Sequence, residues 1–276
     1  MQHCEIHLKD HFPFLGENGR DPKLTLYLPR NIAAMGRQDW LKPTILVCPG
    51  GAYHDISERE SEPIALQFLV KGYNVLVLSY SCAPNPFPTQ LHEVAAVMEL
   101  IYRNKSEWHC DTDKVAIMGF SAGGHLAAHY STCYDCAEVR AVFPDSKPVQ
   151  ASILGYPVIT GYPPYRHIGS IINVSGHNEP TDEDLDKFSL ETKITDKTPP
   201  AFLWHTSEDA GVPVMNSLLY AQGLAAHKIP FALHIYPHGG HGLSTVDEQT
   251  NNNLSEKAML ADIWITEAIK WLKVTL

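Results

Sequence analysis

Short apolar runs recur along the chain, and most of them contain almost no polar residue. Six of these runs lie at residues 44–48, 74–80, 114–118, 151–154, 201–205 and 231–236. Near-continuous apolar runs rich in β-branched residues are typical of strands buried on both faces, as in a parallel sheet. The run at 24–28 ("LTLYL") instead alternates in character, which predicts an antiparallel strand nearer the edge of the sheet.

Amphipathic segments separate these runs and predict helices. Residues 61–72 begin with Ser61 and Pro63 and end at Gly72, residue types that are common at helix starts and ends. A second helix is predicted after Thr89, where apolar residues recur at spacings of three and four: Leu91, Val94, Ala95, Met98, Ile101 and Tyr102. Strands and helices that alternate in this way predict an α/β fold with a doubly wound, mostly parallel sheet.

One segment interrupts the alternation. Residues 156–199 contain prolines, glycines and polar residues without a clear strand, although the acidic cluster at 182–184 predicts a helix start. A loop of this length is unusual inside a compact domain unless it has a function. We therefore predict a single domain over residues 1–276, with 156–199 as a cap-like insertion of one or two short helices. It should lie over the C-terminal edge of the sheet, where open α/β folds bind ligands. A last helix is predicted over residues 255–274.

Composition and charge limit the partners of the protein. The chain has 276 residues with 21 basic and 31 acidic side chains, giving a formal net charge of −10. This balance argues against nucleic acid and anionic membranes, which both require a basic face. The start of the chain ("MQHCEIHLKDHF") lacks the apolar core of a signal peptide, and no stretch approaches the ~20 apolar residues of a membrane span. We expect a cytoplasmic protein with six free cysteines, and we allow for a homodimer.

The strongest chemical candidate is Ser121, which stands between Gly119 and Gly123 in "MGFSAGGHLAAH". An apolar run leads into this motif and a helical pattern follows at once. A direct strand-to-helix reversal forces its central residue into a strained conformation, and only very small neighbours avoid a collision. The serine hydroxyl then stands clear of the sheet, near a helix N-terminus that favours developing negative charge. The pattern G-x-S-x-G also arises by chance, so its position between strand and helix carries the prediction.

A nucleophilic serine needs an imidazole base and a group that orients the imidazole. In this fold class both follow later in the chain, in loops after strands. Glu208 and Asp209 follow the run at 201–205, while His238 and His241 follow the last run. The residues alone leave both choices open, although the pattern favours Asp209 and His241.

An oxyanion hole is predicted in "LVCPGGAYHD", the loop after the first buried strand. It offers Gly50, Gly51 and Ala52, whose small side chains let backbone N–H groups approach a substrate carbonyl. The third donor should be the N–H of Ala122, the residue after the nucleophile.

Taken together, these stretches resemble the α/β-hydrolase fold. More narrowly, they resemble the esterase/lipase group with an "HGGG"-type oxyanion loop, in the branch of small cytoplasmic sugar-ester hydrolases and acetyl-xylan-esterase-like proteins. The segments that carry the resemblance are "CPGGAY", "GFSAGGHLAA", "PPAFLWHTSEDAGVPVMNSLLYAQGL" and "HIYPHGGHGLS". It implies a catalytic triad of Ser121, Asp209 and His241, with Asp209 in the acid position of "TSEDAGVP" and His241 in the base position of "GGHGL".

The resemblance also implies that Gly51 and Ala52 occupy the second and third glycine positions of the oxyanion loop. Here the sequence departs from the group, because Pro49 stands where the group has histidine and Ala52 replaces the last glycine. Alanine does not adopt the positive φ angles of glycine easily, whereas its backbone N–H is retained.

The predicted function is hydrolysis of short-chain acyl esters, acetyl esters above all, of sugars or oligosaccharides. The reaction passes through an acyl-enzyme and requires no cofactor. Aromatic rings suit the flat faces of sugars, and Tyr53 and Tyr156 are the candidate substrate contacts.

Two alternatives use the same residues. The chain could be an amidase or peptidase with the same triad, or a ligand-binding protein that keeps the fold without turnover. The second alternative is disfavoured because no triad member is missing. A metal site is not expected, since Cys133 and Cys136 form a lone C-x-x-C without a second pair at zinc spacing.

Overall fold

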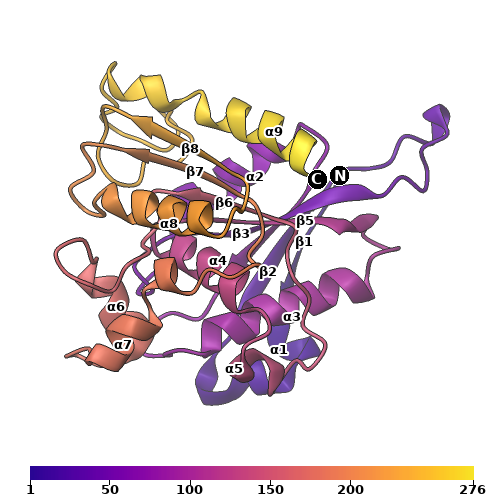
Figure 1. The fold of residues 1–276 in the computed structure, drawn as a ribbon. Coiled ribbons are helices and arrows are strands. Elements are labelled where there is room, and N and C mark those ends of the chain that lie inside the picture. The colour runs from indigo at the N-terminus through magenta and orange to yellow at the C-terminus, as the bar shows by residue number, and fades with distance from the viewer.

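The apolar runs form the central strands of one eight-stranded sheet in the computed structural model, which describes residues 1–276 (Figure 1). Six neighbouring strands pair in parallel. The two strands at one edge pair antiparallel with each other, and the inner of the two is also antiparallel to the neighbouring parallel strand. In spatial order the strands are β1 (Gln2–His7), β2 (Lys23–Leu28), β4 (Asn74–Ser79), β3 (Lys42–Cys48), β5 (Cys110–Phe120), β6 (Ala151–Gly155), β7 (Ala201–Thr206) and β8 (Phe231–Tyr236). The predicted fold class is confirmed, including the antiparallel orientation of the strand at 24–28.

Helices cover both faces of the sheet (Figure 1). A core cluster of 45 buried residues lies between the sheet and α3, α4 and α8, and a second cluster of 24 lies beneath α2 and α9. The helices are α1 (Leu8–His11), α2 (Glu62–Leu69), α3 (Thr89–Arg103), α4 (Ser121–Cys133), α5 (Ala137–Arg140), α6 (Ile168–Ser175), α7 (Asp182–Lys187), α8 (Met215–Ala226) and α9 (Trp264–Thr275). Short 3-10 turns occupy Pro13–Gly19, Ala33–Met35, Glu58–Glu60, Leu190–Thr192 and Ala258–Ala261.

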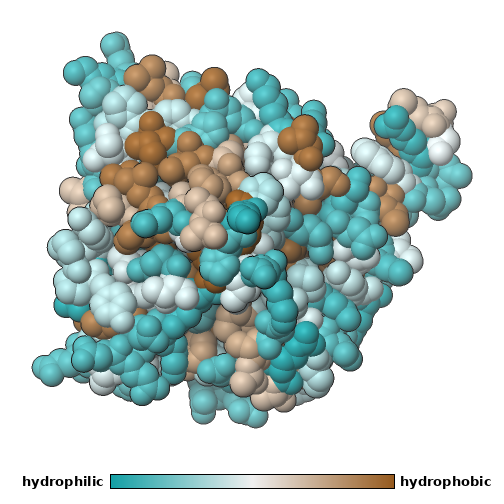
Figure 2. Space-filling model, viewed as in Figure 1, coloured by the Kyte–Doolittle hydropathy of each residue, from teal (hydrophilic) through white to brown (hydrophobic).

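The two edge strands differ from the sequence prediction. β1 was not predicted, because Gln2–His7 is largely polar and exposed, yet it pairs along its whole length with β2. β8 was predicted to be buried on both faces, and this is wrong. Phe231 and Ile235 are each 38% exposed, since β8 is the last strand and has a neighbour on one side only. Figure 2 shows apolar residues gathered on the side of the molecule where β8 and α8 lie.

The helix ends were predicted with mixed success. Ser61 directly precedes α2, but its hydroxyl donates to the Ser57 carbonyl and does not cap the helix. The acidic cluster does start α7, with Thr181 and Asp184 forming a capping box. The last helix begins only at Trp264, nine residues later than predicted, since a 3-10 turn precedes it.

The segment 156–199 contains α6, α7 and one 3-10 turn, in agreement with the short helices predicted there. Its helix α6 reaches the loop after β3, where the side-chain amide of Asn173 donates to the Ala52 carbonyl at 2.9 Å. All six cysteines are free thiols, as predicted. None of the helices has both the length and the apolar character needed to cross a membrane.

Candidate active site

The turn between β5 and α4 has the strained geometry predicted from its glycines. Ser121 adopts a φ of 53°, in the left-handed region that side chains other than glycine usually avoid. A Cβ atom on Gly119 would lie 2.1 Å from the Gly123 carbonyl oxygen, and one on Gly123 would lie 2.1 Å from the Cys48 carbonyl oxygen. Both glycines are therefore required for the chain to reverse so sharply, and the predicted backbone strain is confirmed.

Three side chains that lie far apart in the sequence meet above this turn. Ser121 Oγ lies 2.7 Å from His241 Nε2, and His241 Nδ1 lies 2.7 Å from Asp209 Oδ2. Ser121 is buried apart from its access to the adjoining cavity, and Asp209 is almost fully enclosed. The arrangement provides a nucleophile, a base and a group that orients the base.

The other candidate pair also forms, but it lies on the surface. Glu208 Oε1 is 2.8 Å from His238 Nδ1, and both residues are more exposed than Asp209 and His241. The structure brings only His241 into contact with Ser121. The loops after β7 and β8 thus carry two acid–histidine pairs. The inner pair, Asp209 and His241, faces the cavity, and the outer pair, Glu208 and His238, lies on the surface.

Both carboxylate oxygens of Asp209 contact polar groups of the protein. Its Oδ1 accepts the backbone N–H groups of Gly211 and Val212 at 2.9 Å each, while the fully buried His205 lies 3.3 Å from Oδ2. Burial alone would raise the pKa of Asp209, but its contacts with His205 and His241 outweigh it and hold this pKa below its usual value. The carboxylate is therefore ionised and fixed. His205 was missed in the sequence, although a histidine within an apolar strand was a signal.

The loop after β3 has an unusual backbone conformation and carries backbone N–H groups without a partner in the protein. Gly51, Ala52 and Tyr53 have φ angles of 125°, 56° and 58°, so the alanine adopts the conformation of the glycine it replaces. The N–H groups of Gly51 and Ala52 donate to no other group of the protein. Ala122 lies in the first turn of α4, where backbone N–H groups lack intrahelical acceptors. These are the three N–H groups predicted to form the oxyanion hole.

The buried carboxylate of Glu60 connects the loops of the site. Glu60 is 2% exposed, and its Oε2 accepts the N–H of Gly50 at 2.7 Å. Its Oε1 accepts the Tyr156 hydroxyl at 2.6 Å, and that hydroxyl accepts the N–H of Ser244 at 3.0 Å. One side chain thus joins the predicted oxyanion loop, the start of the 156–199 segment and the loop after His241.

Tyr53 and Tyr156, the predicted substrate contacts, lie behind the cavity and do not line it. Tyr53 is 1% exposed and its hydroxyl is 2.8 Å from His125 Nδ1. The ring of Tyr156 packs edge-on against His241, with 5.1 Å between the ring centroids. Both side chains were predicted in the correct region, but they contact other protein groups, because their hydroxyls are needed to satisfy buried partners.

A cavity of about 440 Å³ opens beside Ser121. Ala52 is the only apolar side chain that lines it. The other side chains that line it are polar and include His54, Ser57, Arg59 and His167. Such a lining favours a small, hydrated, hydrogen-bonding ligand over a long hydrocarbon chain.

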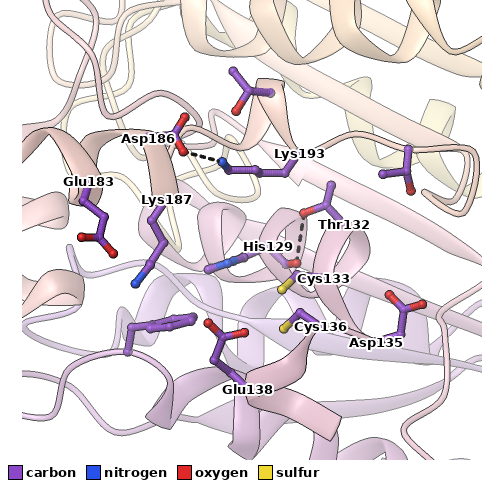
Figure 3. Close-up of a pocket in the computed structure, with 13 residues that line it drawn as sticks. His129, Thr132, Cys133, Asp135, Cys136, Glu138, Glu183, Asp186, Lys187 and Lys193 are labelled. Atoms are coloured by element: carbon purple, nitrogen blue, oxygen red, sulfur yellow. Dashed lines mark hydrogen bonds and ion pairs between the residues drawn. The ribbon is translucent and has the colours of Figure 1, made fainter.

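A second cavity of about 530 Å³ lies at the opposite end of α4 and contains none of the predicted catalytic residues (Figure 3). His129, Cys133 and Cys136 line one side of it, and Lys193 pairs with Asp186 at 3.0 Å on the other. No three histidine, cysteine or acidic side chains of the chain are placed to hold a metal ion together.

Two segments of the chain match models of known protein families. Residues 24–159 match the BD-FAE family model, and residues 164–267 match the model of the prolyl oligopeptidase family. The crystal structure of an acetyl ester-xyloside bifunctional hydrolase from Caldicellulosiruptor lactoaceticus superposes with a TM-score of 0.84 at 31% identity, covering 98% of this chain and 96% of that one.

Two curated relatives are longer proteins. Endo-1,4-beta-xylanase B of Butyrivibrio fibrisolvens is 38% identical over 81% of this chain, which covers 36% of that protein. Acetylxylan esterase of Xylanibacter ruminicola is 30% identical over 83% of this chain, which covers 45% of that protein. The chain therefore spans less than half the length of these two relatives.

Proposed function

The chain belongs to the α/β-hydrolase family, in the group of serine esterases related to acetylxylan esterases and other carbohydrate esterases, and on this premise we propose that it hydrolyses short-chain acyl esters of sugars or oligosaccharides, acetyl esters above all. The observation that carries the proposal is the hydrogen-bonded series from Asp209 through His241 to Ser121. A serine hydroxyl in this setting is activated for attack on a carbonyl carbon.

In the proposed reaction, His241 takes the proton of Ser121 as Oγ attacks the ester carbonyl. The N–H groups of Gly51, Ala52 and Ala122 hold the oxyanion, and each such donor is worth ~2.7–4 kcal/mol in the transition state. His241 then protonates the leaving alcohol, and water repeats the sequence on the acyl-enzyme. Asp209 holds the imidazole in the required tautomer and stabilises its cation.

The substrate class is supported by the cavity and by the relatives. A cavity lined almost entirely by polar groups suits a hydroxyl-rich alcohol component and a short acyl group. The relative from Caldicellulosiruptor is named an acetyl ester-xyloside bifunctional hydrolase and that from Xylanibacter an acetylxylan esterase. We extend the class of acetylated, xylose-containing sugars to this chain.

The experiment compares wild type, Ser121→Ala and His238→Ala on p-nitrophenyl acetate and acetylated xylo-oligosaccharides. Loss of the nucleophile should reduce kcat by at least about 10³-fold, in line with other serine hydrolases. His238 belongs to the outer acid–histidine pair, so its loss should leave the rate nearly unchanged. Equal rates in wild type and Ser121→Ala would reject the esterase proposal. Activity on p-nitrophenyl acetate without acetate release from the oligosaccharides would reject the sugar component alone.

Amide hydrolysis is a second candidate because residues 164–267, which contain Asp209 and His241, match the prolyl oligopeptidase family. Acyl-amino-acid p-nitroanilides test it directly. Turnover of these amides at a rate above that of the esters would reverse the order of the two proposals. A fluorophosphonate probe that fails to label Ser121 would instead favour the ligand-binding alternative.

A further inference from the structure

His167 is the one cavity-lining imidazole that comes from the 156–199 segment. It is the N-cap residue of α6, and its Nδ1 accepts the backbone N–H of Ser170 at 3.3 Å. Ser170 Oγ also lies 2.8 Å from the same nitrogen. A backbone N–H can only donate, so Nδ1 of this ring carries no proton.

The proton of the neutral ring is therefore on Nε2. Burial lowers the pKa of His167 and a positive charge on His241 would lower it further, although the negative charge of Asp209 opposes the shift. The net shift favours the neutral ring. No group of the protein accepts a hydrogen bond from His167 Nε2, while the ring borders the space that holds Ser121 and His241. The N–H group is a fixed, unused donor at the edge of the substrate space.

The position of this donor is fixed relative to the oxyanion loop. His167 is held against the first turn of α6, and Asn173 on the same helix donates to the Ala52 carbonyl at 2.9 Å. A substrate whose carbonyl oxygen lies at Gly51 and Ala52 therefore meets the imidazole of His167 at a defined place.

We propose that His167 Nε2–H binds the oxygen of a free hydroxyl next to the ester, so that the enzyme prefers monoacylated vicinal diols, the arrangement found in partly acetylated sugars. His167 is then a specificity-determining residue for the alcohol component. The inference rests on the proposed function, because it concerns the same cavity and the same ester.

Two substitutions separate the role of Nδ1, which caps α6, from the role of Nε2, which donates to the substrate. His167→Asn places a carboxamide oxygen near the position of Nδ1, so it retains the N-cap of α6 and removes the Nε2 donor. His167→Gln places an amide N–H near the position of Nε2, so it retains the donor and loses the cap. Thermal unfolding of both variants reports on the cap, and substrate selectivity reports on the donor.

The substrates are 2-hydroxyethyl acetate and propyl acetate, which have the same acyl group and the same number of non-hydrogen atoms. The measured quantity is the ratio of their kcat/KM values, divided by the ratio of their hydroxide-catalysed rates to remove the difference in leaving-group reactivity. Wild type should prefer the hydroxyethyl ester about tenfold, the effect of one hydrogen bond. His167→Asn should bring the ratio close to one, and His167→Gln should retain most of the preference.

His177→Asn is the matched control on the same segment, because His177 is exposed and lines no part of the cavity. It should keep the wild-type ratio. A wild-type ratio of one, or a His167→Asn ratio equal to that of wild type, would overturn the inference. The proposed function would still hold in that case if the activity depends on Ser121. Failure of wild type to hydrolyse either ester and p-nitrophenyl acetate would overturn the proposed function itself.

Discussion

Asp209 receives hydrogen bonds on both carboxylate oxygens, which makes it the most constrained of the three aligned side chains. Its neighbour Glu208 has the same chemistry but pairs with His238 in solvent. The sequence narrowed the acid to these two residues and favoured Asp209. It could not show why, because the deciding contacts come from His205 and from the loop that follows.

The first prediction is that Asp209→Asn lowers kcat by about 10⁴-fold, as the equivalent change does in other triads. The amide NH₂ group of asparagine must face either the two backbone N–H groups or the two imidazoles, and both positions already hold donors. The imidazole of His241 then loses the partner that fixes its tautomer. Steady-state kinetics on p-nitrophenyl acetate measure the effect. Glu208→Gln is the control and should stay within about twofold of wild type, since exposed ion pairs contribute little. A similar loss in both variants would contradict the assignment.

At the scale of elements, the turn from β5 into α4 could be predicted in detail because its requirements are local. Gly119, Ser121 and Gly123 are neighbours in sequence, and sterics alone relate them. The edge strands could not be predicted in this way. The apolar residues of β8 read like those of a central strand, and only the order of the sheet shows that one side of β8 is open.

The second prediction concerns Gly123→Ala. The added Cβ would lie 2.1 Å from the Cys48 carbonyl oxygen and 2.2 Å from that of Pro49, and backbone atoms cannot move aside easily. Overpacking of this kind lowers the free energy of unfolding by about 1–3 kcal/mol or more. Urea-induced unfolding measures the change. Gly240→Ala is the control, because a Cβ there meets nothing within 4 Å. Equal midpoints for the two variants would contradict the steric account of the turn.

The third prediction concerns Glu60, whose carboxylate joins three loops. Glu60→Gln keeps the size of the side chain but turns one acceptor into a donor, so either Gly50 or Tyr156 loses its partner. We expect kcat to fall about tenfold with a smaller change in KM, because the shift affects the oxyanion loop more than substrate binding. Glu58→Gln, two residues earlier and exposed, should behave as wild type. An unchanged kcat in Glu60→Gln would show that the loops hold their positions without this carboxylate.

At the scale of the whole molecule, the features that could not be predicted from the sequence are contacts between distant segments. The bond from Tyr156 to Glu60 joins residues 96 positions apart, and no periodicity or motif encodes such a pair. The parallel core, the strained serine and the order of the candidate acid and base could be predicted, since each depends on a local pattern or on the side of the sheet where a strand ends. Tyr156 was placed in the right region and given a substrate contact, although it supports the loop of His241 instead.

The buried histidines of α4 should make stability depend on pH. Burial lowers the pKa of His125 to about 4, although its hydrogen bond with the Phe188 carbonyl opposes the shift. Burial also lowers the pKa of His129, and the positive charges of Lys193 and Lys187 add to the effect. An unfolded histidine titrates near its ordinary value of about 6.5, so between pH 6.5 and 4 the unfolded chain binds more protons than the folded one. Stability must therefore fall as the pH falls through this range.

The buried carboxyl of Glu93 changes the stability in the opposite direction as the pH falls. Burial raises the pKa of Glu93 to about 7, although hydrogen bonds from Ser81 oppose the shift, so the folded protein holds a proton there that the unfolded chain releases above its usual pKa. Burial also lowers the pKa values of His92 and His167 and raises that of Glu191. Four histidines with lowered pKa values thus outnumber two carboxyls with raised ones, so the unfolded chain binds more protons below pH 6.5.

The fourth prediction is that the free energy of unfolding falls as the pH falls below 6.5, by about 1.4 kcal/mol per pH unit for each extra proton that the unfolded chain binds. Urea unfolding between pH 6.5 and 5 measures the slope. His125→Gln should reduce it markedly, whereas the exposed His227→Gln should not, and a variant slope equal to that of wild type would show that His125 is protonated in the folded protein.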